Sequence, residues 1–256
     1  MEKIVHGLKG ADVDGGITPE EIEQLPMTGF KGEIHVITRP GLGYLKAVAY
    51  LKSQTILGFD TETRPVFSPG ARHNKVALLQ LSGPDRAYLF RLNEMGLGRR
   101  ICSILSNPAI LKIGAASHDD VCGLQKRSKF EERGFVDLQK IAWQWGIRDK
   151  SVKKLAANIL GIRISKTQQL SNWEAPELSD AQRLYAATDA WVCREMYIRL
   201  LNSEKHPLSE EEKLPPEQRP APVEAKPDNG EAASAPVKKK RKRKKKHVKN
   251  ILEEGA

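Results

Sequence analysis

The stretch Thr55-Ile56-Leu57-Gly58-Phe59-Asp60-Thr61-Glu62 is a compact apolar run that ends in acids, and it predicts a central β-strand. Because side chains at i and i+2 of a strand point to the same side, Asp60 and Glu62 present two carboxylates together at its carboxyl end. These charges repel each other, and a divalent cation such as Mg²⁺ or Mn²⁺, which prefers oxygen ligands, would relieve the repulsion. The alternative is an ordinary strand-end turn with solvated acids, which an isolated pair of this kind favours.

Further apolar runs on both sides of this strand predict a mixed sheet. Two of them flank the turn signal Gly83-Pro84-Asp85 and predict a hairpin over residues 76–90. Other strands are expected at residues 33–37 and 110–114. Helical spacing is expected at residues 19–24, 45–51, 96–105, from about residue 119, and from Val136 onward. This order of elements predicts an α/β domain.

Two helices in the second half of the chain have clear end signals. Ser151 can cap a helix that Gly161 ends. Ser179 with Gln182 matches a capping box, and the helix that follows is expected to run to about Leu201.

Acids also occur where a packed domain should resist them. Asp119 and Asp120 follow the strand at residues 110–114, although acids are common in a first helical turn. Tyr185 and Asp189 share one helix face, which continues through apolar residues. An acid within an apolar stripe is unfavourable unless it is paired or coordinates a metal, so Asp189 indicates a site. For Tyr185 alone, a core tyrosine is the simpler interpretation.

Composition divides the 256-residue chain into parts. Residues 203–256 contain no aromatic residue and 7 of the 15 prolines, so we expect this segment to be disordered. The predicted parts are a loosely packed leader at residues 1–29, one folded domain at residues 30–202, a Pro-rich linker at residues 203–237 and a basic tail at residues 238–256.

The tail contains nine consecutive cations, and the formal net charge of the chain is +10. A run of one sign repels itself, stays extended and binds phosphates without sequence preference. We therefore expect a nucleic-acid partner, with a nuclear localisation signal as the competing interpretation if the source is eukaryotic. The predicted nucleic-acid-binding cations are Lys238, Lys239, Lys240, Arg241, Lys242, Arg243, Lys244, Lys245 and Lys246.

Membrane insertion and secretion are not expected, because no apolar run reaches bilayer length and the N-terminus has no signal-peptide core. Cys102, Cys122 and Cys193 are widely spaced, which argues against a disulfide framework and a cysteine-rich zinc site. We expect a cytoplasmic protein, with a monomer favoured.

Three segments in order resemble the exonuclease motifs of the DEDD superfamily, in the tyrosine form of its ribonuclease D and Werner-type branch. They are GFDTET at residues 58–63, KIGAASHDD at residues 112–120 and LSNWEAPELSDAQRLYAATDA at residues 170–190. The histidine form of the third motif would need His at the position of Leu184. The resemblance implies a ribonuclease H-like fold over residues 30–201 and a metal-dependent 3′–5′ exonuclease that releases nucleoside 5′-monophosphates.

The resemblance also implies the catalytic set: Asp60, Glu62, Asp120, Tyr185 and Asp189. The four acids would hold two divalent cations, Mg²⁺ or Mn²⁺, with Asp119 as the second choice for the second-motif ligand. Tyr185 would orient the attacking water, because a tyrosine of ordinary pKa is a poor base at neutral pH. The sequence departs from the family pattern at Arg64 and Pro65, which would alter the approach to the site.

Contacts to nucleic acid are expected from four further residues. Lys166, in a polar loop, could meet a phosphate. Trp173 could stack on a base or simply pack, and the residues favour neither. By resemblance, Gln80 and Leu81 would face the terminal base. The alternative function is a catalytically silent scaffold of the same fold, with the basic tail carrying the function.

Overall fold

The computed structural model describes residues 16–68, 70, 74–214 and 218. Its centre is a six-stranded mixed sheet with the order β1-β4-β3-β2-β5-β6, in which only β3 runs opposite to its neighbours. The carboxyl ends of the other five strands therefore meet at one edge of the sheet. The strands are β1 (Glu33–Ile37), β2 (Ile56–Glu62), β3 (Leu78–Ser82), β4 (Arg86–Arg91), β5 (Leu111–Gly114) and β6 (Phe135–Asp137). The predicted α/β class, the central strand and the hairpin are confirmed.

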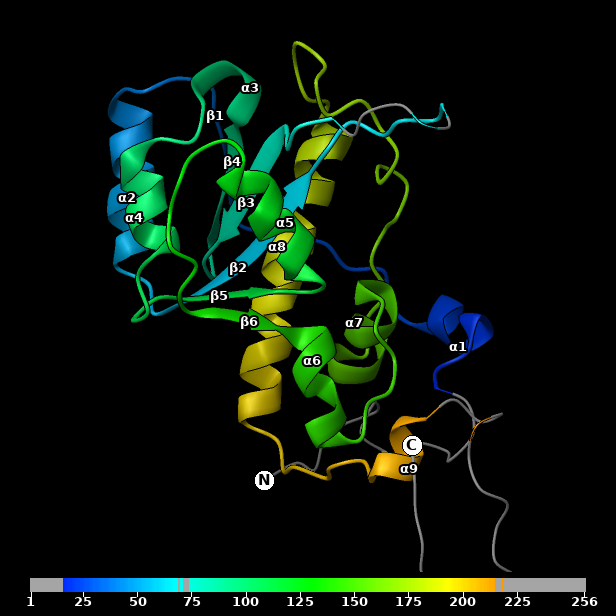
Figure 1. Ribbon diagram of the computed structural model, residues 1–256. Helices are drawn as coiled ribbons and strands as arrows, with labels where there is room; N and C mark the ends of the chain where they lie inside the picture. Colours follow the sequence, from blue (N-terminus) through cyan, green and yellow to red (C-terminus); the bar gives the residue numbers. More distant parts are fainter. Residues whose placement is uncertain (1–15, 69, 71–73, 215–217, 219–256) are drawn as a thin grey trace, which may run out of the picture. The chain divides into compact units, whose positions relative to one another are not determined.

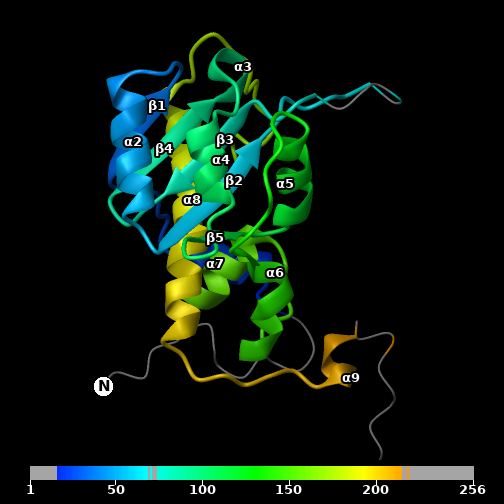
Figure 2. The ribbon, with the colours of Figure 1, turned by 60° about the vertical axis from the view of Figure 1, so that its left-hand side comes forward.

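Helices cover both faces of the sheet. α2 and α4 lie on one face and α8 crosses the other, with α7 beside it (Figure 1, Figure 2). One apolar cluster fills the layer under α2 and α4, and a second fills the layer between the sheet, α7 and α8. The helices are α1 (Pro19–Gln24), α2 (Leu42–Lys52), α3 (Leu92–Met95), α4 (Arg99–Leu105), α5 (Ser117–Gln125), α6 (Leu138–Ile141), the 3-10 helix η1 (Ala142–Trp145), α7 (Val152–Leu160), α8 (Asp180–Leu201) and α9 (Glu210–Lys213).

The long helix α8 begins and ends as its sequence predicts. The Ser179 hydroxyl accepts from the backbone N–H of Gln182, and the Gln182 side chain accepts from the Ser179 N–H, which together form a capping box. Gly58 lets α8 lie directly on β2, because a Cβ at this glycine would stand 1.8 Å from the carbonyl oxygen of Ala190. This close approach brings the middle of α8 onto the strand that carries the paired acids.

The start of helical structure at Val136 was predicted wrongly, because Val136 lies in β6 and α6 begins only at Leu138. β6 has three residues, and its pairing with β5 creates a strand where no sequence period can be seen. Its last residue, Asp137, then caps α6 by accepting from the backbone N–H of Gln139 at 3.0 Å.

The described part of the predicted leader is packed rather than loose. Ile22 of α1 is 2% exposed, and the backbone N–H of Thr28 donates to the carbonyl oxygen of Arg163 at 2.9 Å. A capping box from Thr18 to Glu21 stabilises the start of α1. The segment therefore docks on the folded domain through an apolar side chain, a backbone bridge and ion pairs of Glu23 with Lys153 and Arg163.

Ordered structure also extends beyond Ser203, where disorder was expected. Leu208 is buried, and its N–H donates to the carbonyl oxygen of Trp143 at 3.0 Å. The Lys213 ammonium lies 3.6 Å from the centroid of the Trp143 ring. The segment has no aromatic residue of its own, but the folded domain provides the surface on which it packs. A compact unit ends at Arg219, and the basic tail lies outside the described residues.

None of the helices in the described ranges combines the length and apolar character that a bilayer crossing requires. Cys102, Cys122 and Cys193 are free thiols.

Candidate active site

Three acids from distant parts of the chain meet where α8 crosses the carboxyl end of β2. Asp60 and Glu62 point from β2 toward α8, and Asp189 points back from the middle of that helix. One carboxylate oxygen from each lies within 4.8 Å of the others. Asp189 is 6% exposed, and its Oδ1 has no hydrogen-bond partner among the described residues. The structure therefore brings these three acids together, and they do not have the arrangement of solvated acids in a strand-end turn.

The fourth acid, Asp120, arrives from α5, which follows β5. Its Oδ1 accepts a hydrogen bond from the hydroxyl of Thr61, the residue between the two acids of β2. Asp119 is exposed to solvent instead. Of the two candidates, Asp120 is therefore the one that joins the acidic cluster.

The turn that leads into α5 contains two features that the sequence analysis missed. Ala116 has φ +57°, and it is the one non-glycine residue of the described ranges with positive φ. Its N–H donates to Asp137 Oδ1 at 3.0 Å, which holds this strained turn in place. Asp137 thus caps α6 and also supports the start of the helix that carries Asp120. The only feature of the sequence that could have indicated this role is the position of Asp137 at the end of β6, a strand too short to be recognised.

Crowding and burial raise the pKa values of these acids. Burial raises the pKa of Asp60 well above its usual range, and the charges of Asp189 and Asp120 raise it further. The same causes, burial and then the charge of Asp60, raise the pKa of Glu62 to about 10. Burial also raises the pKa of Asp120 to about 6 and that of Asp189 to about 6. The cluster therefore holds more negative charge than its surroundings can stabilise, which is the condition that favours a bound cation.

One cation and one hydroxyl moderate this charge. The ammonium of Lys166 lowers the pKa values of Asp60, Glu62 and Asp189, although burial has the larger effect on each. Tyr185 lies one helical turn before Asp189, and its hydroxyl is hydrogen-bonded to that carboxylate. Burial and the neighbouring carboxylates raise the pKa of Tyr185 far above its usual value. The hydroxyl therefore keeps its proton at neutral pH, and in this form it can hydrogen-bond to a water.

The side chains of three predicted nucleic-acid contacts are fully buried in this structure. Leu81 packs in the cluster under α2 and α4, on the face of the sheet away from Asp60. Gln80 is the cross-strand partner of Asp60 but has no exposed surface. Trp173 packs beside the Tyr185 ring, with 5.9 Å between centroids, so the packing interpretation holds for it. The predicted contacts of residues 238–246 lie outside the described residues.

The segment after Glu62 is joined to the loop that carries Trp173. Arg64 Nη1 and Glu174 Oε2 lie 3.6 Å apart, and the Arg64 side chain is half exposed. This ion pair occupies the position at which the sequence departs from the motif pattern, beside the acidic cluster.

The mixed sheet, the acids at the end of its central strand and the tyrosine one turn before the helical aspartate define an α/β nuclease of the ribonuclease H-like class. Residues 44–203, more than half of the chain, match the family described as 3′-5′ exonuclease, and the chain belongs to this family. It therefore contains a 3′–5′ exonuclease domain, and the resemblance drawn from the three motifs is confirmed.

Curated relatives agree with this assignment. The chain is 30% identical over 163 residues to the bifunctional 3′-5′ exonuclease/ATP-dependent helicase WRN of Mus musculus. The matched region covers 59% of this chain and 11% of that protein. It is 31% identical over 163 residues to the exonuclease 3′-5′ domain-containing protein 2 of Mus musculus, and this match covers 59% of this chain and 25% of that protein. The chain thus spans a quarter or less of the length of these relatives.

Solved structures share the fold. The EXO domain of Nibbler from Aedes aegypti superimposes with a TM-score of 0.60 and 22% identity, over 68% of this chain and 91% of that one. Ribonuclease D of Escherichia coli superimposes with a TM-score of 0.59 and 20% identity, over 66% of this chain and 44% of that one. That protein is described as an exoribonuclease involved in structured RNA processing.

Proposed function

We propose that this chain is a metal-dependent exonuclease that hydrolyses nucleic-acid phosphodiester bonds from the 3′ end and releases nucleoside 5′-monophosphates. The observation that carries the proposal is the convergence of Asp60, Glu62 and Asp189 within 4.8 Å. Asp120 joins them through its hydrogen bond to Thr61. A cluster of hard oxygen ligands on a rigid strand and helix is suited to phosphoryl chemistry.

The donor set fits divalent cations. Its oxygen atoms come from carboxylates, which Mg²⁺ and Mn²⁺ prefer, and the buried Oδ1 of Asp189 has no described partner. Asp60, Glu62 and Asp189 would hold the metal, and Asp120 would support a second ion. Bound ions supply Lewis acidity at the scissile phosphate and lower the pKa of the attacking water.

The protein's own groups position the reactants. Tyr185 keeps its proton, so its hydroxyl holds the attacking water in line with the phosphorus atom. The Lys166 ammonium, which lies close enough to the acids to lower their pKa values, meets a phosphate oxygen of the substrate. Burial of Trp173 against Tyr185 fixes the tyrosine ring. Together these residues bind and orient the terminal phosphodiester.

The alternative is a catalytically silent scaffold that binds nucleic acid. The presence of all four acids and the tyrosine in one site favours hydrolysis, because a scaffold has no need for carboxylates that repel both each other and the phosphate backbone. The proposed partner in both cases is a nucleic-acid strand. A cytoplasmic location is our proposal, with a nuclear one if the basic run acts as a localisation signal in a eukaryote.

The test compares matched 5′-labelled RNA and DNA oligonucleotides with Mg²⁺ or Mn²⁺. The wild type should shorten at least one of them from the 3′ end. Asp60→Ala and Asp120→Ala should abolish shortening, whereas Asp119→Ala, the exposed neighbour, should retain it. A wild type that shifts the strand on a gel without shortening it would establish the scaffold instead.

A further inference from the structure

A groove of about 590 Å³ lies between α2 and the edge strand β1, apart from the acidic cluster. The groove faces the α2 side of the sheet, whereas Asp60 and Asp189 lie on the α8 side. The lining residues Glu33, His35 and Ile37 show that the groove follows β1 along its whole length, and β1 is separated from β2 by β4 and β3. It is therefore separate from the candidate active site. Its lining residues are Glu33, His35, Ile37, Gly43, Lys46, Ala49, Tyr50, Ser53, Arg86 and Tyr88.

The fold creates this groove through the position of α2. β1 is the last strand of the sheet, and α2 packs its apolar residues with Tyr88 and Phe90 of the neighbouring strand β4. The groove-lining residues of α2 include Gly43 and Ala49, and the C-cap residue Ser53 also lines it; all three are small. The α2-facing side of β1 consequently remains open between the helix and the sheet edge.

Aromatic rings form the floor and one wall of the groove. The His35 ring stacks on Tyr88 with 5.0 Å between centroids and 18° between planes. Tyr50 contributes a third ring, 5.5 Å from that of Tyr88. The His35 side chain is 40% exposed, so its stack on Tyr88 can be extended by one more flat ring.

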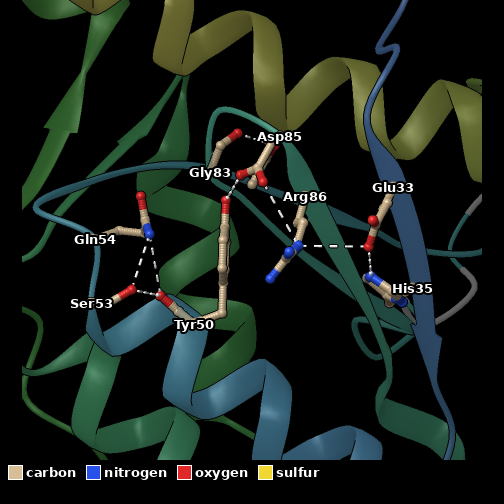
Figure 3. Close-up of polar contacts among 9 residues, drawn as sticks. Glu33, His35, Tyr50, Ser53, Gln54, Gly83, Asp85 and Arg86 are labelled. Carbon is tan, nitrogen blue, oxygen red and sulfur yellow. Dashed lines mark hydrogen bonds and ion pairs between the residues drawn. The ribbon is translucent and has the colours of Figure 1, made fainter.

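The guanidinium of Arg86 lies beside Tyr50 (Figure 3). The guanidinium carbon of Arg86 stands 5.1 Å from the Tyr50 centroid. The carboxylates of Glu33 and Asp85 lie 3.5 and 3.7 Å from its Nε atom and form ion pairs with it. Lys46 projects from α2 into the same groove and forms no ion pair with any described residue. Its ammonium is thus the cation that remains available to an anionic ligand.

We propose that this groove binds one nucleotide unit, with the base stacked on His35 and the phosphate held by Lys46 and Arg86. Stacked rings recognise any base, and Lys46 and Arg86, which both line the groove, carry the charge that suits a phosphate. The volume falls within the range of small-ligand pockets. The unit comes either from a free nucleoside monophosphate or from a nucleic-acid strand that extends across the molecule.

The test measures binding of adenosine 5′-monophosphate and of a single-stranded oligonucleotide in EDTA, where the acidic cluster has no metal. His35→Ala and Lys46→Ala are compared with Lys52→Ala, an exposed lysine of the same helix that does not line the groove. Both groove variants should weaken binding about tenfold, and Lys52→Ala should leave it unchanged. All three variants should hydrolyse a dinucleotide at the wild-type rate, because none of these residues touches the acidic cluster.

The two sources of the nucleotide are distinguished by comparing the ligands. If the groove takes free nucleotides, adenosine 5′-monophosphate binds as tightly as the oligonucleotide. If it takes a strand, the oligonucleotide binds more tightly and the same variants weaken it. The proposal would be overturned if His35→Ala and Lys46→Ala bound each ligand as tightly as the wild type does. It would also be overturned if the wild type bound neither ligand. Because the binding is measured without metal, this outcome is independent of whether the wild type cleaves nucleic acid.

Discussion

Replacing Asp189 by Asn should make the metal-free protein more stable at pH 8. The wild-type carboxyl is 6% exposed and lies within 4.8 Å of two other acids. Asn has nearly the same shape and can still accept a hydrogen bond from Tyr185, but it carries no charge. The substitution therefore removes the cost of burying this charge while it preserves the packing of α8 on β2.

The size of this effect follows from the pKa of Asp189, which burial raises from 3.8 to about 6. A pKa that is higher in the folded state means that the fold favours the protonated carboxyl. That contribution to the free energy of unfolding is present below pH 4 and is lost as the pH rises through 6. Each unit of difference between the folded and unfolded pKa values corresponds to about 1.4 kcal/mol, so the loss amounts to about 3 kcal/mol. Asp189→Asn should avoid this loss.

Urea denaturation in EDTA, at pH 5 and pH 8, tests this expectation. The variant should exceed the wild type by about 3 kcal/mol at pH 8 and by clearly less at pH 5. Added Mn²⁺ should stabilise the wild type more than the variant, because the variant has lost one ligand. A variant that is less stable than the wild type at pH 8 in EDTA, or a difference that does not depend on pH, would refute this reasoning.

Three further expectations concern separate parts of the molecule. Lys112→Met should lower the free energy of unfolding, measured by urea denaturation, by about 3 kcal/mol. The control Lys126→Met replaces an exposed lysine and should leave the free energy of unfolding unchanged. The reason is that the fully buried Lys112 ammonium donates to three carbonyl oxygens at 3.2, 2.9 and 2.7 Å. Tyr185→Phe should reduce kcat about a hundredfold in single-turnover cleavage, with an unchanged melting temperature; an unchanged kcat would remove its role in orienting water. Deleting residues 237–256 should raise the KM for an oligonucleotide at moderate salt and leave kcat nearly constant, whereas an unchanged KM would exclude tethering by the basic run.

Much of the fold could be predicted because its elements have strong local signals. The apolar run that ends at Asp60, the hairpin around Gly83 and the capping box at Ser179 each depend on neighbouring residues only. β6 escaped prediction because a strand of three residues shows no period and exists through its pairing with β5. Leu208 was missed for a similar reason, since the surface that buries it comes from another part of the chain.

The candidate site could be predicted in part. Spacing along a strand and along a helix placed Asp60 beside Glu62, and Tyr185 beside Asp189. The contact between Thr61 and Asp120 depends on how α5 packs against β2, which local spacing does not encode. Leu81 lies on the other face of the sheet from its neighbour Gln80, because one residue in register decides which face a side chain occupies.

The most direct test of the central claim is the number of Mn²⁺ ions bound per chain, counted by electron paramagnetic resonance at neutral pH. The proposed function predicts two ions for the wild type and for Asp119→Asn, and a loss of binding for Asp60→Asn. Equal binding by Asp60→Asn and the wild type would contradict the assignment of the acidic cluster as the metal-dependent catalytic centre.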